Sequence, residues 1–166
     1  MFTVTPSFNY QPFKKSIMKT KVNEISIKYQ GNFKISQAPK ISSSVNAAEL
    51  LYNTWNKDQI GLQETFKVML LNNANKVKGI FEVSTGGITG TLVDLRILFA
   101  VILKSLSCSV ILAHNHPSGT LKPSEADKRL TEKITKAAEL LDIKVLDHLI
   151  ITPDGDYYSF ADEGIL

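Results

Sequence analysis

The chain has 166 residues, of which 43% are hydrophobic, and this is enough to bury the core of one ordinary domain. The formal net charge is +3, but residues 1–45 contribute +6 and the other 121 residues −3. A single cysteine, Cys108, excludes an intrachain disulfide and fits a reducing compartment. No stretch has the length and apolarity of a membrane span or a secretion signal, so we expect a cytoplasmic protein without membrane contact.

Residues 1–44 are predicted to form a flexible, basic N-terminal arm. Two prolines interrupt any regular period at its start. Alternating apolar residues predict a short strand over 22–29, and a second strand is expected around Phe33 and Ile35. Seven lysines can attract nucleic-acid phosphates, although their scattered spacing is also typical of a solvated segment.

Residues 45–166 are predicted to form a single α/β domain. A serine run at 42–44 is expected to cap the first helix, and a buried strand is expected directly before a loop with two histidines. The predicted helices cover about 45–56, 93–106 and 124–141. The predicted strands cover 64–72 and 77–84, which form a hairpin, then 109–113, 144–152 and about 157–160.

His114 and His116 follow the strand predicted over 109–113. Because side-chain direction alternates along a strand, these two side chains share a face and can share one metal ion. Prolines and a glycine then turn the chain back, so the helix that begins at Ser124 can present Asp127 from its first turn. Two imidazoles and one carboxylate leave the fourth position of a tetrahedral zinc ion open for water, as in catalytic sites.

Each of these residues also has a purely structural interpretation. Ser124 and Asp127 fit a helix-capping box, in which the carboxylate stabilises the helix without a metal. His148, in an otherwise apolar strand, is expected to be a buried or hydrogen-bonded histidine rather than a ligand. Cys108 is expected to be a small packing residue before the buried strand. The combined spacing of the two histidines, Ser124 and Asp127 favours the metal site, because the whole pattern rarely occurs by chance.

The same spacing resembles the motif of the JAMM, or Mov34/MPN/JAB, zinc hydrolases, in which an upstream Glu precedes His, His, Ser and Asp. Within that group, the chain is most similar to the RadC-like proteins of bacteria. The resemblance implies a JAB/MPN-like (cytidine-deaminase-like) mixed β-sheet flanked by helices over about residues 45–166. It is carried by the segments 84–94, 111–119, 121–127 and 146–152.

Spacing alone leaves two candidates for the upstream glutamate, since Glu64 and Glu82 both lie on predicted strands. A Gln–Glu pair opens the first strand of the motif in RadC-like proteins, and Gln63–Glu64 matches that pair, so we choose Glu64 and keep Glu82 as the alternative. Zinc (Zn²⁺) would lower the pKa of its water towards ~7, and Glu64 would pass the proton to the leaving amine. Ser124 would donate its hydroxyl to the oxyanion, a role that the resemblance also implies.

Three functions therefore compete. The first is a zinc-dependent metallopeptidase or isopeptidase-like hydrolase that cleaves an amide bond in a peptide or protein substrate. The second is a DNA-binding or DNA-repair protein of the RadC type, which is weakened because residues 1–45 are too short for the helical N-terminal domain of longer family members. The third is a non-catalytic JAB/MPN scaffold, against which the full set of motif residues argues. The sequence names neither the substrate nor the oligomeric state.

Overall fold

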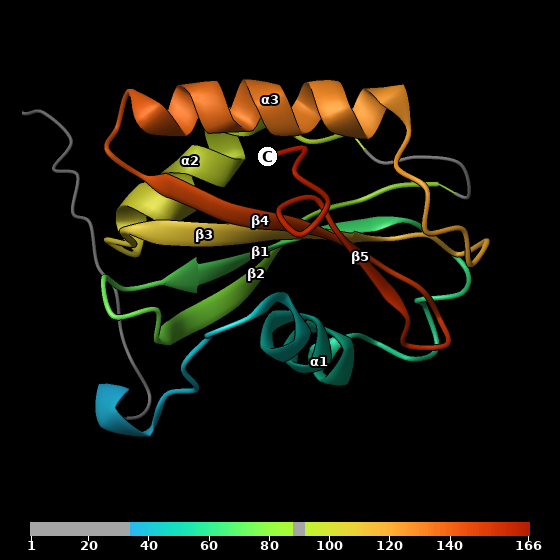
Figure 1. Cartoon of the computed structure of the whole chain (residues 1–166), viewed down its shortest axis with the longest axis horizontal. Coiled ribbons are helices and arrows are strands. Elements are labelled where there is room, and N and C mark those ends of the chain that lie inside the picture. Colours follow the sequence, from blue (N-terminus) through green and yellow to red (C-terminus); the bar gives the residue numbers. More distant parts are fainter. Residues whose placement is uncertain (1–33, 88–91) are drawn as a thin grey trace, which may run out of the picture.

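A central β-sheet organises the molecule, and helices cover both of its faces (Figure 1). The computed structural model describes residues 34–87 and 92–166, so the strand predicted over 22–29 lies outside the described residues. The α/β fold class predicted from the sequence is confirmed. The described elements are η1 (Ile35–Gln37), α1 (Ser44–Thr54), β1 (Thr65–Leu71), β2 (Val77–Thr85), α2 (Leu95–Lys104), β3 (Ser109–Asn115), α3 (Glu125–Glu139), β4 (Lys144–Ile151) and β5 (Tyr157–Ser159).

In the described part of the chain, five strands form one mixed sheet in the order β2-β1-β3-β4-β5. β1 is antiparallel to both β2 and β3, β3 is parallel to β4, and β5 is antiparallel to β4. A parallel pair needs a crossover connection, and α3 supplies it between β3 and β4. Every residue of β1 and β3 is buried, in keeping with the apolar residues that dominate 68–71 and 110–113.

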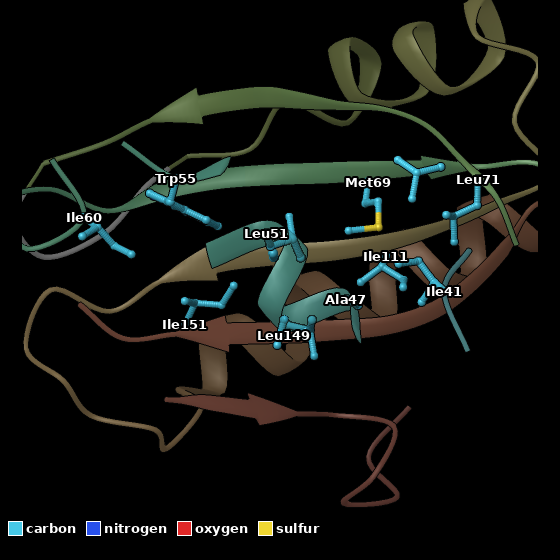
Figure 2. Packing of buried hydrophobic residues seen from close by; sticks show 13 residues of the cluster. Ile41, Ala47, Leu51, Trp55, Ile60, Met69, Leu71, Ile111, Leu149 and Ile151 are labelled. Carbon is cyan, nitrogen blue, oxygen red and sulfur yellow. The ribbon is translucent and has the colours of Figure 1, made fainter. Parts of the chain in front are cut away.

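α1 covers one face of the sheet. Figure 2 shows Ala47 and Leu51 of this helix against Met69, Ile111 and Leu149 of three neighbouring strands. Leu51 is completely buried, and burial of such a side chain contributes about 2 kcal/mol to stability. The helix begins where the Ser43 hydroxyl accepts a hydrogen bond from the Asn46 backbone, as the serine run predicts.

α2 and α3 cover the opposite face, and this face carries the candidate site. Side chains of β1 alternate between the two layers, so Phe66, Val68 and Leu70 point towards α2 and α3 while Met69 and Leu71 point towards α1. On α3, the apolar residues Ile134 and Ala138 are buried against this face of the sheet. Successive side chains of a strand therefore join the two layers in turn.

Two expectations about individual residues are wrong. Ile35 lies in a short 3₁₀ helix rather than a strand, because the chain pairs with the sheet only later, at the isolated bridge between Lys40 and Lys76. Cys108 is exposed rather than packed, since its backbone N–H and C=O pair with neighbouring strands while its side chain faces solvent.

Candidate metal centre

The end of β3 brings the two motif histidines together. His114 is the sixth residue of the strand and only 1% exposed, and the ring of Phe66 from β1 stacks on it at 6.4 Å between centroids. His116 follows just beyond the strand, where its backbone N–H continues the pairing with β4. The Nε2 atoms of the two imidazoles are 3.0 Å apart. The two histidine side chains therefore lie on one face, as their spacing predicts.

A tight loop then returns the chain to the same point. Gly119 donates its backbone N–H to the His116 carbonyl and has a φ of +76°, a conformation that glycine adopts without strain. α3 starts after this loop and presents Asp127 from its first turn. One Asp127 oxygen, Oδ1, lies 3.5 Å from Nε2 of His114, and the other, Oδ2, lies 4.0 Å from Nε2 of His116.

Within the described residues, His114, His116 and Asp127 are the group of histidine, cysteine and acidic side chains that could hold a metal ion. Their candidate ligand atoms all lie within 4.8 Å of one another. His114 closes the inner side of this cluster, while the side chains of His116 and Asp127 are each 15% exposed. The cluster is thus closed to solvent at His114 and partly exposed at His116 and Asp127.

The hydrogen bonds of the histidines suit metal binding. Nδ1 of His116 lies 2.6 Å from the Thr120 carbonyl oxygen, which can only accept, so Nδ1 carries the proton and Nε2 presents a lone pair to the cluster. Burial lowers the pKa of His114 to about 4 against the opposing effect of Asp127, so this imidazole is neutral near pH 7. A carbonyl behind a ligating histidine is a common way to fix its tautomer.

The capping box expected at Ser124 is present. The hydroxyl of Ser124 donates to Oδ2 of Asp127 at 2.5 Å and accepts the Asp127 backbone N–H at 3.1 Å. The backbone N–H of Ser124 also donates to the same carboxylate oxygen at 2.7 Å. The cap holds Asp127 in one rotamer and leaves Oδ1 directed at His114, so capping and ligand placement are compatible in the same segment.

Glu64 directly precedes β1 and is half-buried. Phe66 pairs with His114 across β1 and β3, and extension of this register by two residues would bring Glu64 level with His116 on the same face of the sheet. The Glu64 backbone also bonds to Gly86 and Gly87, at the start of the glycine segment whose residues 88–91 lie outside the described part.

Glu82 lies on the other face. It pairs with Lys67 across β1 and β2, and the two side chains form an ion pair of 3.6 Å between Nζ and Oε2. The Lys67 ammonium also lies 4.5 Å from the centre of the Trp55 ring, in the layer of α1. A bulge between Phe66 and Lys67 sets this register. Glu82 is therefore separated from the histidine cluster by the sheet itself.

Asn115 supports the segment before β1, a role that its place in the sequence did not reveal. Asn115 is fully buried and accepts from the Thr65 backbone N–H while it donates to the carbonyls of Ile60 and Gln63, so it fixes the segment that ends at Glu64. A polar residue between two histidines at the end of an apolar strand is the signal that could have indicated it. His148 is fully buried and hydrogen-bonded, in keeping with the interpretation that it is not a ligand.

A mixed sheet with two histidines at the end of a central strand and an aspartate on the next helix is the arrangement of the JAB class of domain. A family model described as the RadC-like JAB domain matches residues 41–165. The chain therefore belongs to the RadC-like JAB domain family. The match starts ahead of residue 45, and the buried Ile41 likewise joins the core of the domain.

Bacterial relatives agree with this assignment. A UPF0758 protein of Flavobacterium johnsoniae is 56% identical over 102 residues, which are 61% of this chain and 44% of the relative. A UPF0758 protein of Porphyromonas gingivalis is 42% identical over 132 residues, which are 79% of this chain and 58% of the relative. The chain thus spans about half the length of the curated relatives it matches. In the described part of the chain, none of the helices could cross a membrane.

Proposed function

We propose that this protein is a zinc-dependent hydrolase that cleaves an amide bond in a peptide or protein substrate. One observation carries the proposal: two imidazole Nε2 atoms and a carboxylate oxygen from three points of the chain converge within 4.8 Å. Two nitrogen donors and one oxygen donor form the ligand set of many catalytic zinc sites, which retain an open position. Two facing lone pairs at 3.0 Å would repel each other, and a cation between them removes that repulsion.

A bound zinc ion supplies Lewis acidity, which lowers the pKa of water and polarises a carbonyl group. Glu64, level with His116 on the face of the cluster, acts as the general base and then returns the proton to the leaving amine. Ser124 donates its hydroxyl to the oxyanion. In the resting site this hydroxyl donates to Asp127, so the reaction requires it to change its acceptor.

The choice of an amide bond rests on the resemblance to JAMM hydrolases rather than on the geometry. The ligand set itself fits hydrolysis in general, because activated water attacks any suitably placed carbonyl. A peptide or isopeptide bond is the substrate class that the resemblance implies. A cytoplasmic location, for which the single cysteine is the support, belongs to the same proposal.

Metal analysis and a cleavage screen test the site. We expect the wild-type protein to take up about one zinc ion per chain, and His116→Ala and Asp127→Ala to lose it without unfolding. A peptide library and a set of isopeptide-linked lysine substrates then measure hydrolysis by the zinc-loaded protein. A folded wild-type chain that binds no zinc would refute the metal centre. Zinc uptake without cleavage of any substrate would favour the scaffold alternative.

Substitution of Glu64 tests the assignment of the general base. Glu64→Gln should keep zinc affinity but lower the cleavage rate by about 10²- to 10⁴-fold, because the amide cannot accept the proton. Glu82→Gln is the matched control, since it makes the same chemical change on the opposite face of the sheet and should keep the wild-type rate. Full activity in Glu64→Gln, or a comparable loss in Glu82→Gln, would contradict the assignment.

Association with DNA is a second proposed function, and it rests on the charge of +6 in residues 1–45. Such contacts neutralise phosphates without reading sequence, so affinity should fall steeply as salt rises. Fluorescence anisotropy with a labelled duplex from low to moderate salt measures this dependence. No binding at low salt would dispose of the proposal.

A further inference from the structure

A chain of hydrogen bonds runs behind His114, on the side away from the candidate metal position. Nδ1 of His114 lies 2.8 Å from Nε2 of His148 on β4, and Nδ1 of His148 lies 2.6 Å from the Thr131 hydroxyl on α3. That hydroxyl also lies 2.7 Å from the Asp127 backbone carbonyl. The side chains of His114, His148 and Thr131 are each at most 3% exposed, so water does not compete for these hydrogen bonds.

The hydroxyl of Thr131 sets the direction of the chain. A hydroxyl has one hydrogen, and the Asp127 carbonyl can only accept, so Thr131 uses its hydrogen there and offers its lone pairs to His148. Nδ1 of His148 must then carry a proton and donate to Thr131. In a neutral imidazole the other nitrogen is left as an acceptor, so Nε2 of His148 accepts from Nδ1 of His114.

The consequence falls on the nitrogen of His114 that faces the cluster. With its proton on Nδ1, neutral His114 presents an unprotonated Nε2 to His116 and Asp127. We propose that Thr131 and His148 are positioning residues that hold His114 in the tautomer required for metal binding. This inference rests on the proposed metal centre. It assigns roles to two residues that would not themselves bind the metal ion.

The reversed order of donors and acceptors would leave Thr131 with an unfavourable contact. If His148 carried its proton on Nε2, His114 would carry its own on Nε2 and donate it to His116, which blocks the metal position. Thr131 would then have to donate to His148, and its contact with the Asp127 carbonyl would join two acceptors at 2.7 Å. The Thr131 hydroxyl therefore disfavours the blocked form.

The ring of His148 has no freedom to find other partners. Phe160 stacks on it at 4.7 Å between centroids, and Phe66 meets it edge-on at 5.5 Å. The same Phe66 stacks on His114, so one aromatic side chain fixes the orientation of both histidines. If the Thr131 hydroxyl is removed, His148 therefore cannot rotate to give its Nδ1–H a hydrogen bond to water.

Two substitutions of Thr131 separate the tautomer effect from packing. Thr131→Val keeps the shape of the side chain but removes the acceptor, so zinc binding must leave the N–H of His148 unpaired. Thr131→Ser keeps the hydroxyl and loses a methyl group. In competition with a chromophoric chelator, we expect zinc affinity to fall about 10- to 100-fold in the valine variant and to stay near wild type in the serine variant. Thr131→Ala replaces valine if that variant does not fold.

Imidazole ¹⁵N NMR reads the tautomers directly. In zinc-loaded wild-type protein we expect His148 to be protonated on Nδ1. In metal-free protein we expect a larger share of His114 protonated on Nε2 in Thr131→Val than in wild type or Thr131→Ser. Equal zinc affinities of the valine and serine variants, equal tautomer shares, or His148 protonated on Nε2 in the zinc-loaded protein would each overturn the inference. The metal-free comparison still decides it if wild-type protein binds no zinc, an outcome that defeats the proposed function separately.

Discussion

Replacement of Asn115 by alanine should loosen the segment that leads into β1. The side chain makes three hydrogen bonds, of 2.7 Å from the Thr65 backbone N–H and of 2.6 and 2.9 Å to the carbonyls of Ile60 and Gln63. Asn115 is fully buried, so its removal leaves these three backbone groups without a partner. Each such group costs about 1–3 kcal/mol, but Gln63 is only half-buried and water can reach part of the gap, so we expect a total near 3 kcal/mol.

Chemical denaturation of the metal-free protein at pH 7 measures this loss. For a domain of this size, 3 kcal/mol corresponds to a decrease in Tm of about 6–12 °C. Asn115→Asp should be at least as damaging, because a carboxylate oxygen would then face two carbonyls. Ser118→Ala, at an exposed hydroxyl of the adjacent loop, is the control and should change stability by less than about 0.5 kcal/mol.

The same substitution has a functional consequence that distinguishes it from a general loss of folding. Glu64 directly follows the segment that Asn115 fixes, whereas Asp127 is held by its own helix cap. We therefore expect Asn115→Ala to lower the rate of hydrolysis more than zinc affinity at a temperature where the variant is folded. A change in unfolding free energy below about 0.5 kcal/mol would refute the assignment of these three hydrogen bonds.

Two further predictions concern stability. Burial lowers the pKa of His114 to about 4 and that of His148 well below its ordinary value, so in metal-free protein the unfolded chain takes up protons below pH 6.5 that the folded chain does not. The free energy of unfolding should therefore decrease as the pH is lowered below 6.5, by up to about 1.4 kcal/mol per pH unit for each histidine. Urea midpoints that stay constant from pH 7.5 to 5 would contradict this. Gly155→Ala should cost about 1–2 kcal/mol, because φ is +92° and the added Cβ would lie 3.2 Å from the Tyr52 ring. Gly79→Ala, with open space around it, is the control, and equal thermal stability of the two variants would count against the strain.

Much of the local structure follows from short-range patterns. The serine caps of α1 and α3, the turn that joins β1 to β2, and the turn before β5 each depend on residues within a few positions of one another. The His-x-His pair likewise needs only the alternation of a strand. The expectations for Ile35 and Cys108 are wrong, because a strand pattern without a partner and a small apolar residue at a chain turn carry no information about what lies beside them.

The sequence by itself determined the motif residues and the faces of their elements, because strand and helix periods place His114, His116 and Asp127 by local geometry alone. The tertiary structure decided which other side chains lie beside those residues. The register of β1 between β2 and β3, with its bulge after Phe66, aligns Phe66 with His114 two residues after Glu64 and puts Glu82 on the opposite face. The contacts of Thr131 and His148 likewise join α3, β4 and β3. Such contacts depend on pairing between distant segments, and no period within one segment encodes them.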